Sequence, residues 1–341
     1  MKDYFERPAV FYGAQTKKGL NWFLELLTFI AVMFVASMAE AIIIIPATIG
    51  LLFSDPDLIP LLQNGDVEKV QSMAQDLLSN DYYAIDALFA TGMAILLTIL
   101  FCKYIQKRKP SSLGFRKSGL LKEYFWGMLW GFVLFSLAVI FCIVTGSLKI
   151  TGLAARIPVG IIVLYFLGYL VQGMSEETLF RGYLMGSVAR RYALPIAILL
   201  NAGTFAAFHL ANDGITVLAF INLVLFGTFA SIYFIKRGSI WGIAALHSVW
   251  NFAQGNLYGI QVSGNQFSSS ILTSEMVGGH EVINGGSFGL EGGLGVTITL
   301  VVGIVILCFM KGKVNHDEIE QEKNIAAGVF AGMQVGTGYQ Q

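Results

Sequence analysis

The sequence predicts an all-α polytopic membrane protein, a bundle of about eight transmembrane helices. Of its 341 residues, 55% are hydrophobic and only 13% are charged, whereas a soluble domain has about 25% charged residues. Its mean hydropathy is +0.66, and most of its apolar stretches approach the ~20 residues that a helix needs to cross the hydrocarbon. This hydropathy predicts a lipid bilayer as the partner. The net charge is zero, so we predict no nucleic acid as a partner.

The first apolar run extends from about Trp22 to Phe53. It is far longer than the apolar core of a signal peptide, which has roughly 7–15 residues, and we therefore predict a spanning helix. Seven further runs follow, at Tyr83–Ile105, Tyr124–Val144, Ile157–Met185, Leu194–Leu210, Ile215–Ile235, Ile240–Tyr258 and Leu294–Met310. Together they predict a transmembrane domain over residues 21–313, between an N-terminal segment of residues 1–20 and a flexible tail of residues 314–341.

Lysine and arginine are concentrated in alternate loops. Eighteen of the 22 lie in the N-terminal segment, in the loops after the second, fourth and sixth runs, and in the tail. Because basic residues mark cytoplasmic loops, both termini are predicted to be cytoplasmic.

Two loops on the opposite side are long. Residues 54–82 are acidic and amphipathic, which predicts a short surface helix. Residues 259–293 are rich in glycine and serine and contain no lysine or arginine. We predict a flexible exposed loop there, with a lid over the outer face as the alternative. The cysteines, Cys102, Cys142 and Cys308, all lie in apolar runs without a CxxC motif, which is typical of buried small side chains rather than disulfides or metal ligands.

Three charged residues interrupt the fourth apolar run: Glu176, Glu177 and Arg181. A charge at membrane depth costs about 2.5–3.5 kcal/mol even on the lenient insertion scale. Glu177 and Arg181 are four residues apart on one helix face, so they are predicted to pair as a structural clamp. Glu176 points about 100° away and is predicted to be a functional carboxylate.

Two later runs contain polar residues at helical spacing. His209 follows Phe205 by one turn, and Asn251 follows His247 by one turn. A lone histidine in an apolar helix is usually a hydrogen-bonded core residue, but two histidines, an amide and a carboxylate from three runs indicate a shared site. His280 and His316 are predicted to be surface residues. Asp86 and Glu40 are predicted to be polar contacts between helices, with a cavity role for Glu40 kept as the less favoured alternative.

These residue types suit peptide hydrolysis without a covalent intermediate. A carboxylate and a histidine can activate a water, while a second histidine and an amide stabilise the oxyanion. Alternatively, Glu176, His209 and His247 could bind zinc with water as the fourth ligand. No HExxH motif is present, so the zinc hypothesis lacks its strongest signature.

The motifs EExxxR at Glu176, FxxxH at Phe205 and HxxxN at His247 resemble those of the CAAX prenyl protease 2 type, in its bacterial Abi (bacteriocin-processing) branch of intramembrane proteases. The resemblance covers about residues 155–260. It implies an eight-helix endopeptidase of the bacterial plasma membrane, acting on a lipidated, membrane-anchored or hydrophobic peptide. It also implies that Glu176 and His209 activate the water and that His247 and Asn251 stabilise the oxyanion, and it leaves metal dependence open.

Two other hypotheses belong to different classes. One is a proton-coupled transporter that uses Glu176 and the histidines as a relay, although no half-repeats are visible. The other is a catalytically idle immunity or scaffold protein with the same fold.

The peptidase hypothesis also carries a geometric condition, because straight helices would place His209 nearer the outer face than Glu176. The fifth helix must therefore start deep, tilt or break near Gly203.

Overall fold

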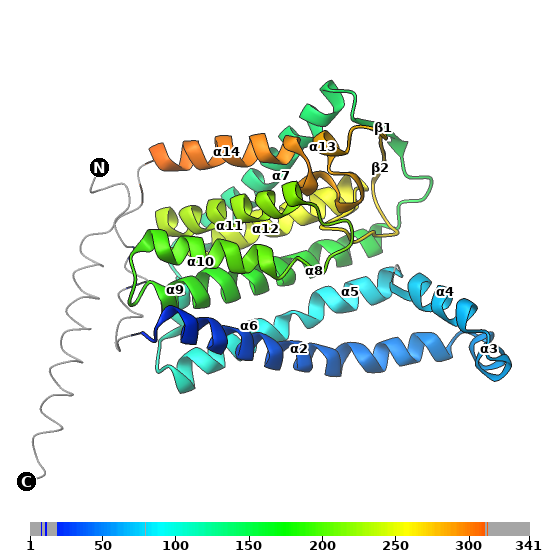
Figure 1. Ribbon diagram of the computed structural model, residues 1–341, viewed down its shortest axis with the longest axis horizontal. Coiled ribbons are helices and arrows are strands. Elements are labelled where there is room, and N and C mark those ends of the chain that lie inside the picture. Colours follow the sequence, from blue (N-terminus) through cyan, green and yellow to red (C-terminus); the bar gives the residue numbers. More distant parts are fainter. Residues whose placement is uncertain (1–7, 9–10, 12–18, 79, 311, 313–341) are drawn as a thin grey trace, which may run out of the picture.

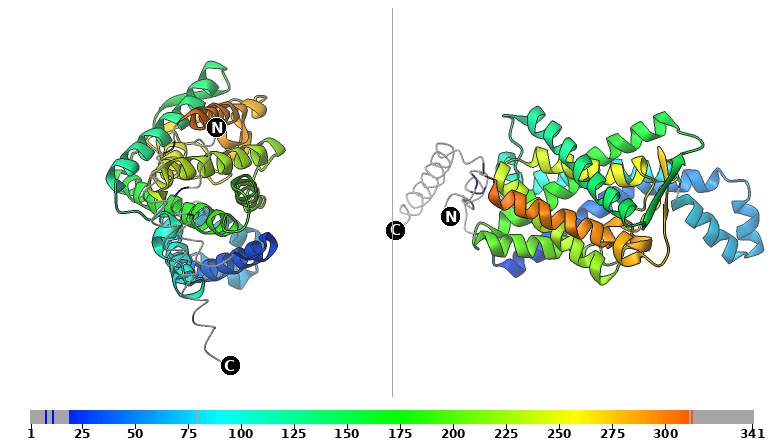
Figure 2. Two further views of the ribbon diagram at one scale, coloured as in Figure 1. Left: turned by 90° about the vertical axis from the view of Figure 1, so that its left-hand side faces the viewer. Right: turned by 90° about the horizontal axis from the view of Figure 1, so that it is seen from above.

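The computed structural model describes Pro8, Phe11, residues 19–78 and 80–310, and Gly312. Within these residues the chain is a bundle of helices that run roughly along the long axis of the molecule (Figures 1 and 2). This confirms the predicted all-α class. Most of the N-terminal segment, the tail and His316 lie outside the described residues.

Five helical units are long and apolar enough to cross a membrane. They are α2 (Trp22–Phe53), α5 (Asp81–Ala90) continuing through α6 (Gly92–Leu100) and a π-helix (Phe101–Ile105), α7 (Leu120–Val144), α8 (Val159–Glu177) continuing through a π-helix (Thr178–Met185) and α9 (Gly186–Val188), and α11 (Val217–Arg237). The chain is therefore an integral membrane protein.

The remaining predicted spans form shorter helices. They are α10 (Leu194–Ala207), α12 (Ile240–Phe252) continued by a π-helix (Ala253–Leu257), and α14 (Leu294–Phe309). All eight predicted segments are thus helical. Five meet the length and composition of a membrane span, so the count of eight spans stays a prediction.

Helix α12 is buried inside the bundle, where α7 and α8 pack against it. Glycines make this approach possible. A Cβ at Gly131 of α7 would overlap the carbonyl of Leu246, and one at Gly173 of α8 would overlap the hydroxyl of Ser248. Small residues allow membrane helices to approach closely, and here they hold the motif residues of α12 against α8.

The segment of residues 54–82 contains two helices, α3 (Leu58–Asn64) and α4 (Val67–Leu78), where one was predicted. They lie at the end of the bundle where α2 ends, beyond the packed helices (Figure 1). Gly65 separates them, with a left-handed φ of 67° that caps α3. A glycine tolerates that conformation at no steric cost, which explains why the amphipathic stretch is divided.

Residues 259–293, which we call the outer segment, are folded and partly buried, so the prediction of a flexible exposed loop is wrong. Strand β2 (Leu272–Met276) pairs antiparallel with β1 (Leu148–Leu153). Helix α13 (Glu281–Asn284) and two 3₁₀ turns follow. Gly289 has a φ of 87°, and a Cβ there would overlap the carbonyl of Gln261. The glycines therefore permit tight turns rather than flexibility.

Candidate active site

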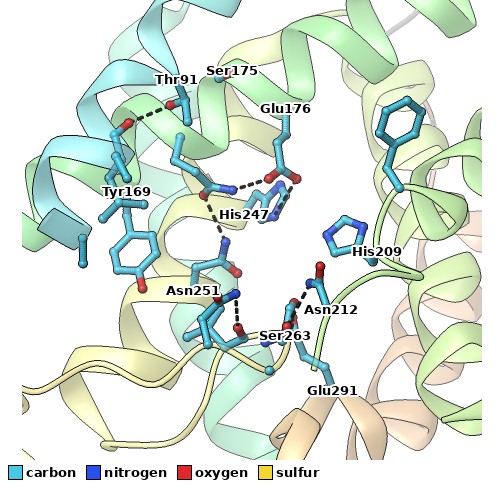
Figure 3. A pocket seen from close by; sticks show the side chains of 18 of the residues that line it. Thr91, Tyr169, Ser175, Glu176, His209, Asn212, His247, Asn251, Ser263 and Glu291 are labelled. Carbon is cyan, nitrogen blue, oxygen red and sulfur yellow. Dashed lines mark hydrogen bonds and ion pairs between the residues drawn. The ribbon is translucent and has the colours of Figure 1, made fainter. Parts of the chain in front are cut away.

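A cavity of about 770 Å³ lies between α2, α5, α8, α12 and the outer segment. Glu176, His209, His247 and Asn251 all line it, as Figure 3 shows. The structure thus brings together the four residues for which the sequence predicted catalytic roles. None of the residues that line this cavity is a lysine or an arginine.

Glu177 is completely buried and connects two other motif residues. Its Oε1 accepts a hydrogen bond from Arg181 Nη1 at 3.0 Å and another from His247 Nδ1 at 2.9 Å. Because Glu177 Oε1 already accepts from Arg181, it also serves as the acceptor for His247, so His247 Nδ1 carries a proton. The other ring nitrogen, Nε2, lies 3.8 Å from Glu176 Oε2.

Aromatic rings surround the buried guanidinium. Arg181 lies 4.7 Å from the ring centroid of Phe205 and 6.0 Å from that of Phe226. Phe226 in turn contacts His247 edge-on, with 4.8 Å between the centroids. A cation is attracted to the face of an aromatic ring. Phe205 therefore packs against the Glu177–Arg181 pair. Phe226, which sequence reasoning did not identify, lies near Arg181, contacts His247 and also lines the cavity.

A hydrogen-bonded chain joins Glu176 to Asn251 through Gln172. Gln172 Nε2 donates to Glu176 Oε1, and Asn251 Nδ2 donates to Gln172 Oε1 at 3.1 Å. Sequence reasoning missed Gln172, although it precedes Glu176 by four residues and therefore lies on the same helix face. Glu176 Oε2 and the second amide N–H of Asn251 take no part in this chain.

His209 lies in the turn that follows α10 and is half-buried. Its Nδ1 bonds the carbonyl of Phe205 at 2.8 Å. Since a carbonyl can only accept, Nδ1 carries a proton, and Nε2 of the neutral ring is then an acceptor. The helix is unbroken at Gly203 and ends at Ala207. Fourteen residues span about 21 Å, less than the ~30 Å hydrocarbon, so a short fifth helix brings His209 to the cavity.

The zinc hypothesis fits this arrangement poorly. Within the described part of the chain, no three His, Cys, Asp or Glu side chains lie close enough together to hold a metal ion. Glu176 and His247 are neighbours, but His209 does not complete a three-donor cluster with them. The cysteines are all free, with Cys102 and Cys142 buried.

Residues 158–253 match the family model described as type II CAAX prenyl endopeptidase Rce1-like. This segment is similar to the Rce1-like domain. It contains all three motifs, from Glu176 to Asn251, and the match supports a CAAX-type intramembrane endopeptidase in general terms. No curated protein and no solved structure matches the chain.

The outer segment closes one side of the cavity of the Rce1-like domain. The buried Glu291 holds this segment in place through three hydrogen bonds. Its Oε1 accepts from Trp250 Nε1 at 3.1 Å. Its Oε2 accepts from the backbone N–H of Ser263 at 3.0 Å and from the Ser263 hydroxyl at 2.6 Å. Asn212 Nδ2 donates to the Ser263 carbonyl at 2.9 Å. Sequence reasoning missed these contacts, because they join residues up to 51 positions apart.

Glu40 of α2 also lines the cavity. The sequence favoured a contact between helices for this residue, with a cavity role as the alternative, and its position agrees with the alternative. Asp86 does not line the cavity. The Rce1-like domain is therefore completed by residues outside its matched range, from α2, α5 and the outer segment.

Proposed function

We propose that the protein hydrolyses a peptide bond within the membrane, using a water activated by Glu176 and His209. The observation that carries this proposal is the convergence of Glu176, His209, His247 and Asn251 from three separate segments on one cavity. Any one of these side chains has an ordinary structural explanation. Their common cavity in a bundle of apolar helices favours a shared chemical task.

Glu176 and His209 each offer an acceptor for a water proton. Glu176 Oε1 is engaged by Gln172, whereas Oε2 has no hydrogen-bond partner among the described residues. On His209, the bond from Nδ1 to Phe205 leaves Nε2 as the acceptor. A water bound to both would lose a proton as it attacks the carbonyl carbon, and the same proton could then pass to the leaving amine.

His247 and Asn251 supply the donors that an oxyanion requires. Asn251 keeps one amide N–H after the bond to Gln172. His247 is held at Nδ1 by Glu177, and its Nε2 lies 3.8 Å from Glu176 Oε2; Nε2 donates when the ring is protonated. Both donors are held before substrate binds, which is the condition for electrostatic stabilisation of the transition state.

For the substrate we propose a lipidated, membrane-anchored or hydrophobic peptide. The family description names prenyl endopeptidases, and Met33, Leu88 and Phe208 give the cavity apolar lining next to its polar centre. The protein would act in a bacterial plasma membrane with both termini cytoplasmic, because the basic loops lie on that side.

The test is cleavage of a fluorogenic lipidated reporter peptide by the purified full-length protein. Glu176→Gln is expected to lower kcat by about 10²–10⁴-fold, the contribution typical of a general base, with an unchanged melting temperature. Glu68→Gln, at an exposed position on α4, is the matched control and should keep full activity. Undiminished cleavage by Glu176→Gln would refute the mechanism.

A strong chelator should leave the rate unchanged, because the donors do not form a three-ligand cluster.

A further inference from the structure

A second groove opens between α7, α11 and α14. Its volume is about 320 Å³, and none of its lining residues lines the candidate active site. In Figure 1 these three helices lie on the side of the bundle opposite α2 and α5. The groove is therefore separate from the candidate active site.

The wall of the groove is apolar. Trp126, Trp130 and Leu134 follow one another at intervals of four residues, so they share one face of α7. The two tryptophans are 43% and 44% exposed. Phe229 forms the opposite wall, and Gly303 of α14 leaves room for it, since a Cβ there would lie 2.9 Å from Phe229 Cε2.

One end of the groove is basic. Lys122, Lys236 and Arg237 line it where α7 begins and α11 and α14 end. Arg237 pairs with Glu123 through two bonds, of 2.8 and 2.5 Å, and Lys236 Nζ donates to the carbonyl of Met310 at 3.0 Å. Lys122 is exposed. Among the described residues that line the groove, three are thus cationic and none is a carboxylate.

We propose that this groove binds an anionic phospholipid from the leaflet at its basic end. An acyl chain would lie between the tryptophans and Phe229, and the phosphate would lie beside the exposed Lys122. Basic pockets between membrane helices attract anionic head groups. A peptide is the poorer occupant, because the apolar wall would leave its backbone N–H groups without partners.

The test is native mass spectrometry of the full-length protein with equimolar phosphatidylglycerol and phosphatidylcholine of identical acyl chains. The wild type should retain phosphatidylglycerol preferentially. Lys122→Gln should reduce that preference about fivefold, the effect of one cation near the membrane surface. Lys109→Gln removes an exposed charge outside the groove at the same end of the bundle, and it should leave the preference intact.

A second variant tests the apolar part. Ile306 lines the groove and is 50% exposed, so Ile306→Trp can fill the space without disturbing the core. This variant should abolish retention of both lipids at an unchanged melting temperature. Equal retention of the two lipids by the wild type, or equal effects of Lys122→Gln and Lys109→Gln, would overturn the proposal. So would displacement of phosphatidylglycerol by a prenylated reporter peptide, which would assign the groove to the substrate.

Discussion

At the scale of single residues, Glu177 binds two partners through the same carboxylate oxygen. Its Oε1 accepts from both Arg181 and His247, while Oε2, Arg181 Nε and Arg181 Nη2 are buried without a partner among the described residues. A buried ion pair of this kind is costly to form and more costly to break. Glu177 is therefore a positioning residue that sets the orientation of His247. Its ion pair with Arg181 is also needed for the stability of the fold.

Glu177→Gln is expected to lower the free energy of unfolding by about 3–5 kcal/mol, because it leaves Arg181 as an unpaired buried charge. Arg181→Met should cost a similar amount. The double variant should lose less than the sum of the two, since neither partner then remains unpaired. Thermal denaturation in detergent measures all three. Strict additivity would show that the two side chains do not depend on each other.

At the scale of elements, the length of α10 decides the depth of His209. The helix begins after Ala193, with Pro195 in its first turn, and ends at Ala207. Proline is well suited to that first turn because it lacks the N–H that would have no partner there. The chain after Ala207 forms turns that line the cavity, and irregular backbone is tolerated at membrane depth in such a place. A short helix therefore satisfies the geometric condition without a break at Gly203.

The outer segment depends on its glycine turns, and Gly289→Ala tests that dependence. Its φ of 87° disfavours any side chain, and the new Cβ would overlap the Gln261 carbonyl. We expect the free energy of unfolding to fall by more than the ~1 kcal/mol of conformational strain alone. Limited proteolysis within residues 259–293 should accelerate.

Gly278→Ala is the matched control, because nothing lies within 4 Å of a Cβ at that glycine of the same segment. Equal proteolysis rates in the two alanine variants would restore the interpretation of this segment as an exposed loop.

At the scale of the whole molecule, the sequence predicted local pairings and the shared cavity of the motif residues, but not the direct contacts between distant residues. The pairing of Glu177 with Arg181 follows from a spacing of four residues on one helix. The contact between Glu177 and His247 joins residues 70 positions apart and depends on how closely α8 packs on α12. The pairing of Leu148 with Met276 likewise joins two loops, and glycine content alone does not distinguish a tight turn from a flexible segment.

The central claim is that Glu176 and His209 act on one water as a unit. The most direct measurement is a double-mutant cycle on kcat for cleavage of the reporter peptide, with Glu176→Gln, His209→Ala and the combination. Groups that act together are strongly non-additive, so the double variant should be about as slow as the slower single variant. Independent, multiplying losses in the double variant, or turnover that survives both substitutions, would contradict the account.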